Sequence, residues 1–184
     1  VAGAGNDNVS TPFYPAAYDN VLAVAGTDST DTKAAFSNYG TWVDISAPAV
    51  EIVTTYLGGD WGPANGTSLS TPCVAGVAAL IRSQNPEWSA ALVRNQILQT
   101  VDSLDALNPA HAGRLGAGRI NAAQATQDPH PILVLAGTNV NGDPAGRPTP
   151  GETATLAVTL RNDWWDATGV TATLTTADPY VTLG

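Results

Sequence analysis

The sequence is organised around one stretch in which small and hydroxyl residues lead directly into a helix-compatible run. It reads GTSLSTPCVAG at residues 66–76 and continues as VAALIRSQ to residue 84, where an Asn-Pro pair ends the pattern. Because proline lacks an amide hydrogen and restricts the residue before it, we expect the helix to stop there. Ser68 then lies near a helix N-terminus, where free amides and the helix dipole stabilise a developing anion. The alternative is that Ser68 is an ordinary N-cap of a core helix.

Composition and charge exclude several classes of function. The chain has 184 residues, of which 43% are hydrophobic, and a net charge of −9 from 16 acidic and 7 basic residues. Without a Lys/Arg cluster, this acidic excess argues against nucleic acid or an anionic membrane surface as a partner. No apolar run approaches the roughly 20 residues that span a bilayer. The single cysteine, Cys73, excludes an intrachain disulfide and a cysteine-based metal site.

The stretch around Ser68 resembles a known signature. It is similar to the Gly-Thr-Ser-x-(Ala/Ser)-x-Pro-x-Val-Ala-Gly motif around the nucleophile of subtilisin-like serine peptidases, with Cys73 where many members carry histidine. The element Ala-Gly-Asn at residues 4–6 resembles the family's Ala-Ala-Gly-Asn, whose asparagine donates to the oxyanion. The resemblance therefore implies that Ser68 is the nucleophile and Asn6 the oxyanion donor. On its own, Asn6 also fits a plain turn.

The resemblance covers residues 1–126 and implies an α/β fold, the C-terminal part of a subtilisin-like parallel-sheet domain. The consecutive apolar residues at 21–26 fit a buried parallel strand, and Ser89 fits the N-cap of a second helix. Residues 127–131 are predicted to be a linker. Residues 132–184 are predicted to begin an immunoglobulin-like β-sandwich, with strands at 132–135, 153–160 and 170–175. Such a sandwich needs about seven strands, so we expect a partial domain.

A substrate pocket is also implied by the resemblance, because the family lines it with residues after the oxyanion asparagine and around a Tyr-Pro pair. At the matching positions stand Asp7, Phe13 and Tyr14. Phe13 fits equally well as a surface aromatic beside a loop.

The resemblance suggests one weak structural site for Ca²⁺ or Na⁺. We expect that the reaction requires no cofactor. The ligands of the ion site would be the carbonyls of Ala16, Tyr18 and Val21 and the carboxylate of Asp44. Oxygen ligands of this kind suit such cations, although Asp44 alone could simply cap a turn.

No histidine in the sequence stands in the motif that carries the catalytic base in this family. Subtilisin-like chemistry needs an aspartate and a histidine, which the family places before the serine. The only histidines here, His111 and His130, both follow Ser68 and lack the expected motif. We therefore expect an N-terminal part of the catalytic domain to supply the base, and expect the chain alone to be inactive. The complete enzyme would be a secreted or cell-surface endopeptidase acting on proteins or peptides.

Two rival hypotheses remain open. Sedolisin-like acid peptidases share Gly-Thr-Ser-x-x-x-Pro but use an aspartate where Asn6 stands, and their C-terminal calcium motif is not found here. The second rival is a non-catalytic binding fragment. Activity confined to strongly acidic pH would favour the first rival, and absence of the aspartate and histidine elements from the complete protein would favour the second.

Overall fold

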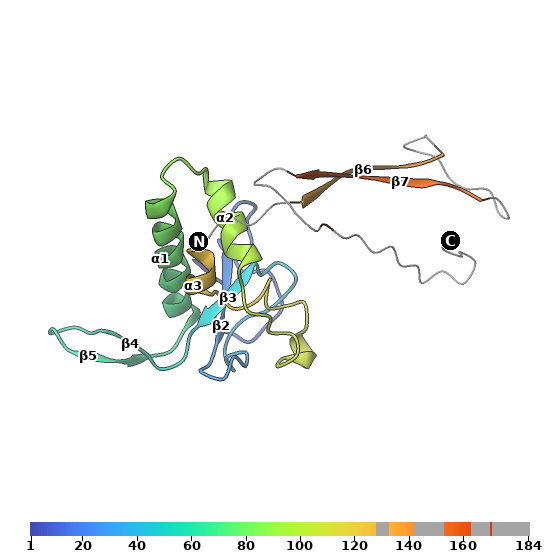
Figure 1. The fold of residues 1–184 in the computed structure, drawn as a ribbon. Helices are drawn as coiled ribbons and strands as arrows, with labels where there is room; N and C mark the ends of the chain where they lie inside the picture. The colour runs from blue at the N-terminus through green and yellow to red at the C-terminus, as the bar shows by residue number, and fades with distance from the viewer. Residues whose placement is uncertain (128–132, 142–152, 163–169, 171–184) are drawn as a thin grey trace. The chain divides into compact units, whose positions relative to one another are not determined.

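The computed structural model describes residues 1–127, 133–141, 153–162 and 170 (Figure 1). The chain divides into two units, Val1–Asp128 and Pro129–Gly184. This division falls inside the segment 127–131 predicted as a linker, most of which lies outside the described residues. Within the described ranges, no helix has the length and apolar character needed to cross a membrane.

The first unit is built on a parallel three-stranded sheet. Its strands are β1 (Ala2–Gly3), β2 (Ala23–Thr27) and β3 (Ile45–Pro48), and their order in the sheet is β1-β2-β3. All five residues of β2 are buried, which explains why its sequence is apolar at consecutive positions rather than alternating. The α/β class and the parallel sheet predicted for this part of the chain are confirmed.

Helix α1 (Thr67–Gln84) covers this sheet and carries Ser68. Its buried residues recur at helical spacing and face the core. They are Thr67, Ser70, Val74, Val77 and Ile81. The hydroxyl of Ser70 donates to the carbonyls of Ala47 and Pro48, both at 3.1 Å, and so joins the first turns of the helix to β3. The helix ends at Gln84, and its C-cap is Asn85, directly before Pro86, as predicted.

A second helix, α2 (Ala90–Gln99), packs beside α1. Its N-cap is Ser89, whose hydroxyl accepts from the Leu92 amide at 3.3 Å, which confirms the predicted start. A 3₁₀ turn at Pro109–His111 and the short helix α3 (Ala122–Ala125) complete the helical elements described. One buried cluster lies where the loops meet the sheet, and its members are Ala4, Ala25, Val43, Leu104 and Leu115.

Residues 116–118 approach the loop before β3 closely enough to require a glycine. Gly116 has φ +75°, and a Cβ added there would lie 2.2 Å from the carbonyl carbon of Asp44. The next amide, of Ala117, donates to the Asp44 carbonyl at 2.9 Å. Glycine at position 116 therefore serves packing, as expected for this end of the domain.

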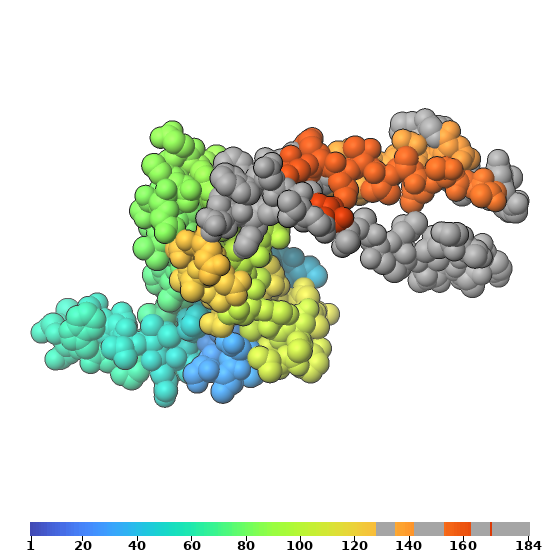
Figure 2. Space-filling model, in the orientation of Figure 1, coloured from blue at the N-terminus to red at the C-terminus, as the bar shows by residue number. Residues whose placement is uncertain are grey.

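An antiparallel hairpin precedes Ser68, and the sequence patterns above do not predict it. Strands β4 (Ile52–Thr55) and β5 (Trp61–Ala64) pair with each other and project away from the sheet (Figures 1 and 2). Its apolar side chains are exposed, with Leu57 at 99%, Trp61 at 71% and Val53 at 67%. Because the hairpin has no buried face here, its sequence lacks the apolar alternation by which strands are normally recognised.

The described residues of the second unit form another antiparallel pair, β6 (Leu133–Val140) and β7 (Leu156–Asn162). A register irregularity between Leu135 and Gly137 interrupts the pairing. These strands match two of the predicted ones, at 132–135 and 153–160. The third, at 170–175, lies outside the described residues except for Val170, so the immunoglobulin-like sandwich stays a prediction.

Candidate active site

Ser68 occupies the second position of α1 and is exposed. The N-cap is Gly66, which makes no side-chain capping bond, so Ser68 is not the cap that the simpler interpretation assumed. The first amides of a helix have no partner within it and point out of its N-terminal end together with the positive pole of the dipole. Ser68 therefore presents its hydroxyl at a place where negative charge is stabilised.

Asn6 lies at the same place, 62 residues earlier in the sequence. Its Oδ1 accepts two hydrogen bonds from Thr67, one from the amide at 2.9 Å and one from the hydroxyl at 3.1 Å. Its Nδ2 lies 3.6 Å from the point that a Cβ on Gly66 would occupy. With the oxygen held in this way, the NH₂ group remains available as a donor beside the start of α1. The fold thus brings the two sequence-predicted residues together.

The three residues predicted to neighbour a substrate pocket are all exposed. Asp7 follows Asn6 directly, and the ring of Phe13 lies against Gly5, 3.2 Å from the point that a Cβ there would occupy. Tyr14 instead packs with Tyr18, the two ring centroids being 4.6 Å apart. Asp7 and Phe13 therefore lie at the loop that carries Asn6, whereas the described ring contact of Tyr14 is with Tyr18.

The predicted cation site contains an ion pair. Asp44 accepts from the Ala23 amide through Oδ2 at 2.8 Å and from the guanidinium of Arg94 through Oδ1. The carbonyl of Tyr18 accepts from the Val21 amide at 3.2 Å. Among the described residues, no three His, Cys, Asp or Glu side chains are grouped to hold a metal. Because Arg94 already neutralises its one carboxylate, this oxygen set does not fit a strong cation site, and a weak site stays a prediction.

Among the described residues, no contact of a histidine identifies it as the base for Ser68. His111 lies in the 3₁₀ turn, where its ring packs on Tyr39 with the centroids 4.5 Å apart. Burial, together with the charges of Lys33 and Arg114, lowers the pKa of His111 below its ordinary value. No hydrogen bond in the described part of the chain joins it to Ser68. His130 lies outside the described residues.

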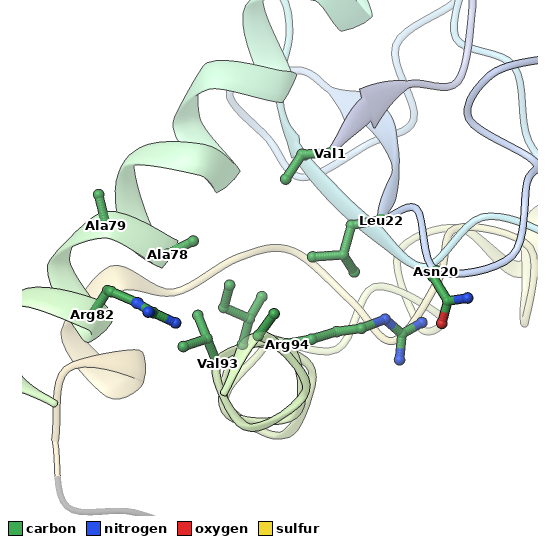
Figure 3. Close-up of a pocket in the computed structure, with 10 residues that line it drawn as sticks. Val1, Asn20, Leu22, Ala78, Ala79, Arg82, Val93 and Arg94 are labelled. Carbon is green, nitrogen blue, oxygen red and sulfur yellow. The ribbon is translucent and has the colours of Figure 1, made fainter. Parts of the chain in front are cut away.

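A pocket of about 380 Å³ lies elsewhere, between α1, α2 and the start of the chain (Figure 3). Its walls are mainly apolar, with Val1, Leu22, Ala78 and Val93 among them. Arg94 extends along it toward the loop that carries Asn20 (Figure 3). None of Ser68, Asn6 or Thr67 lines this pocket, so it is separate from the candidate active site.

Comparison with known proteins identifies the family of this chain. The model of the subtilase family, peptidase family S8, matches residues 1–118, which is more than half of the chain. The chain belongs to the subtilase family. Because the match includes both Asn6 and Ser68, the two residues brought together by the fold lie within the family's catalytic domain.

Curated relatives of this subtilase include Subtilisin BL of Lederbergia lenta, which is 43% identical over 127 residues. That match covers 69% of this chain and 45% of the relative. Thermitase of Thermoactinomyces vulgaris is also 43% identical over 127 residues, covering 69% of this chain and 43% of the relative. The subtilase chain therefore spans less than half the length of these relatives.

Solved structures agree with the fold of this subtilase. The patellamide maturation protease PatA has a TM-score of 0.62 at 36% identity, covering 68% of this chain and 49% of its own. A protease from Pseudoalteromonas arctica gives the same TM-score at 30% identity, covering 67% and 40%. Both of these proteins are proteases.

Two residues of the site carry no role in the sequence interpretation. Thr67 orients Asn6, and it could have been found because it stands inside the Gly-Thr-Ser motif. Asn38 contacts the loop around Asn6 from about thirty residues away. It lies within the segment FSNYG at residues 36–40, but no signal in the sequence distinguishes it from a turn residue.

Proposed function

We propose that this subtilase chain supplies the nucleophile and the oxyanion hole of a serine endopeptidase. The observation that carries the proposal is the hydrogen bonding of Asn6 to Thr67, which leaves the Asn6 Nδ2 available beside the exposed Ser68. A hydroxyl nucleophile and a fixed amide donor at a helix N-terminus are what acyl transfer requires.

In the proposed reaction, the Ser68 oxygen attacks the carbonyl carbon of a peptide bond. The Ser68 proton passes to a histidine base, and the carbonyl oxygen becomes an oxyanion that accepts from Asn6 Nδ2 and the Ser68 amide. Collapse of the intermediate breaks the C–N bond, and the histidine gives its proton to the leaving amine. Water then attacks the acyl carbon and gives a proton to the histidine, and the histidine returns a proton to the Ser68 oxygen as the carboxylic acid leaves.

The histidine and its aspartate are proposed to come from a part of the catalytic domain that this sequence does not contain. The support is that neither family element occurs in the 184 residues and that His111 is engaged with Tyr39. A serine without a positioned base is a poor nucleophile, and loss of triad members lowers the rate by several orders of magnitude. The chain alone is therefore proposed to be inactive.

The proposal also covers the substrate class, the location of the enzyme and the second unit of the chain. Proteins or peptides are the substrates, with Asp7, Phe13 and Tyr14 near the side chain that is recognised. The enzyme acts outside the cell or at its surface. Residues 132–184 begin an immunoglobulin-like accessory domain, for which the antiparallel pair β6–β7 is the supporting observation.

A fluorophosphonate probe tests the nucleophile, because it forms a stable bond only with an activated serine. In a complete catalytic domain containing this chain, the probe should label Ser68, and Ser68→Ala should abolish labelling. Ser83→Ala is the matched control, since Ser83 is also an exposed serine of α1. Labelling that survives in Ser68→Ala would overturn the assignment. Labelling confined to strongly acidic pH would favour the sedolisin-like alternative, and no labelling at any pH would favour the binding fragment.

A further inference from the structure

A single buried residue, Asn38, holds the chain on both sides of Asn6. Before Asn6, the Asn38 amide donates to the Gly5 carbonyl at 3.0 Å, and its Nδ2 donates to the Ala4 carbonyl at 2.9 Å. After Asn6, its Oδ1 accepts from the amides of Asp7 at 2.9 Å and Val9 at 3.2 Å. Asn38 is 0% exposed, so its own polar atoms have no water to replace these four partners.

The chemistry of the site explains why the residue is an asparagine. One carboxamide provides both a donor for the Ala4 carbonyl and an oxygen that accepts from two amides. Gly5 gives the side chain its room, because a Cβ at Gly5 would lie 2.4 Å from Asn38 Nδ2. The Asn38 side chain itself is buried, where an unpaired polar group is expensive, so the arrangement favours one geometry.

The loop that carries Asn6 depends on this support because it has no apolar anchor of its own. Residues 6–10 are all exposed. Asn8 adopts a left-handed conformation with φ +55°, and its amide donates to the Phe36 carbonyl at 2.8 Å. The ammonium of Lys33 donates to Asn8 Oδ1 at 2.8 Å and provides a second brace. The loop is therefore held by hydrogen bonds from residues 33–39.

We propose that Asn38 is a positioning residue of the active site. It fixes the backbone on either side of Asn6, so that the Asn6 Nδ2 meets the developing oxyanion, while Thr67 sets which way the Asn6 carboxamide turns. This inference rests on the proposed function, since it takes Asn6 as the oxyanion donor. Asn38 itself is buried behind the loop and acts only through Asn6.

A double-mutant cycle in a complete catalytic domain tests the proposal with a chromogenic peptide substrate. Asn38→Ala should lower kcat by about ten- to a hundredfold with KM within about twofold, because a displacement of about 1 Å at a reacting centre can have an effect of this size. In the Asn6→Ala background, the same substitution should lower kcat by less than about twofold, because the donor that it positions is gone. Where Asn38→Ala does not fold, Asn38→Ser serves as the second variant.

Asn108→Ala is the matched control. Asn108 is also a buried asparagine, and its side chain bonds to the Lys33 amide at 2.8 Å and to the carbonyls of Asp31 and Leu104 at 2.9 Å. None of these hydrogen bonds involves residues 4–9. Its loss should lower the melting temperature as Asn38→Ala does, yet leave kcat within about twofold.

Equal losses of kcat from Asn38→Ala in both backgrounds would overturn the proposal and leave Asn38 a structural residue. A rise in KM alone would overturn it as well. Fluorophosphonate labelling of Ser68 in the same preparations separates failure of this inference from failure of the proposed function. If Ser68 is labelled but the effects of Asn38→Ala and Asn6→Ala are additive, the positioning role of Asn38 is wrong and the serine mechanism stands. If Ser68 is not labelled, both the role of Asn38 and the serine mechanism are wrong.

Discussion

Thr67 donates to the same oxygen of Asn6 twice, through its amide at 2.9 Å and its hydroxyl at 3.1 Å. The Thr67 hydroxyl also accepts from the Gly5 amide at 3.2 Å, and Thr67 is 2% exposed. One buried side chain at the first position of α1 therefore links the helix that carries Ser68 to the loop that carries Asn6, the two residues proposed as nucleophile and oxyanion donor. Because the Asn6 oxygen is the acceptor, the NH₂ group is the part of the carboxamide that can donate in the proposed reaction.

We predict that removing the Thr67 hydroxyl weakens this orientation without abolishing it. Thr67→Val keeps the amide bond to Asn6 but loses the hydroxyl bond to Asn6 and the bond from the Gly5 amide. The kcat of a complete catalytic domain should therefore fall about five- to tenfold, within the range of one to two neutral hydrogen bonds. Thr67→Ser restores the hydroxyl and should stay within about twofold of the wild type. Steady-state kinetics measure both variants, and wild-type kcat in Thr67→Val would contradict this role.

The Asp44–Arg94 pair predicts a weak response to calcium. With Asp44 bonded to a guanidinium and to the Ala23 amide, chelation of calcium should change the melting temperature by less than about 2 °C, well under about 1 kcal/mol. Arg94→Ala removes the competing cation, so millimolar calcium should then stabilise the protein. Arg82→Ala is the control, because Arg82 lines the same pocket and bonds the Trp88 carbonyl instead. A calcium-dependent rise of several degrees in the wild type would show that the cation site forms despite the pair.

His111 should make stability depend on pH. Burial and the neighbouring charges of Lys33 and Arg114 lower its pKa below the ordinary 6.5. As pH falls through 6.5, the unfolded chain takes up a proton that the folded one still refuses, so the free energy of unfolding decreases until the folded pKa is reached. His111→Gln should remove this decrease when urea unfolding is compared at about pH 7.5 and about pH 5.

The same substitution separates stability from catalysis. Since no described hydrogen bond joins His111 to Ser68, His111→Gln should leave kcat of a complete catalytic domain within about twofold. His130→Gln is the composition-matched control. An unchanged pH dependence of stability in His111→Gln would contradict the assignment of its pKa, and a loss of kcat by orders of magnitude would make His111 a candidate for the base.

The sequence predicts the local features of this site well, because they are written in short patterns. Small and hydroxyl residues before an apolar run locate α1 and Ser68, Ser89 locates the start of α2, and consecutive apolar residues locate β2. Each of these features depends on neighbours within a few residues, where backbone chemistry alone decides the structure.

The relationships that organise the site are long-range, and the sequence alone does not predict them. Asn38 bonds residues that precede it by about thirty positions, and Arg94 pairs with Asp44 across fifty. Nothing local marks either residue, because its partner is chosen by the packing of loops over the sheet. The β4–β5 hairpin was missed for a different reason, since its exposed strands carry no apolar alternation.

Peptide cleavage by the purified 184-residue chain tests the central claim most directly. The claim is that this subtilase holds the nucleophile and the oxyanion hole but not the base. We expect no cleavage that phenylmethylsulfonyl fluoride inhibits from the chain alone, and restoration of such cleavage on co-expression with a polypeptide carrying the family's aspartate and histidine elements. Ser68→Ala should abolish the restored activity. Robust, inhibitor-sensitive cleavage by the chain alone would contradict the claim, because the base would then have to be His111 or His130.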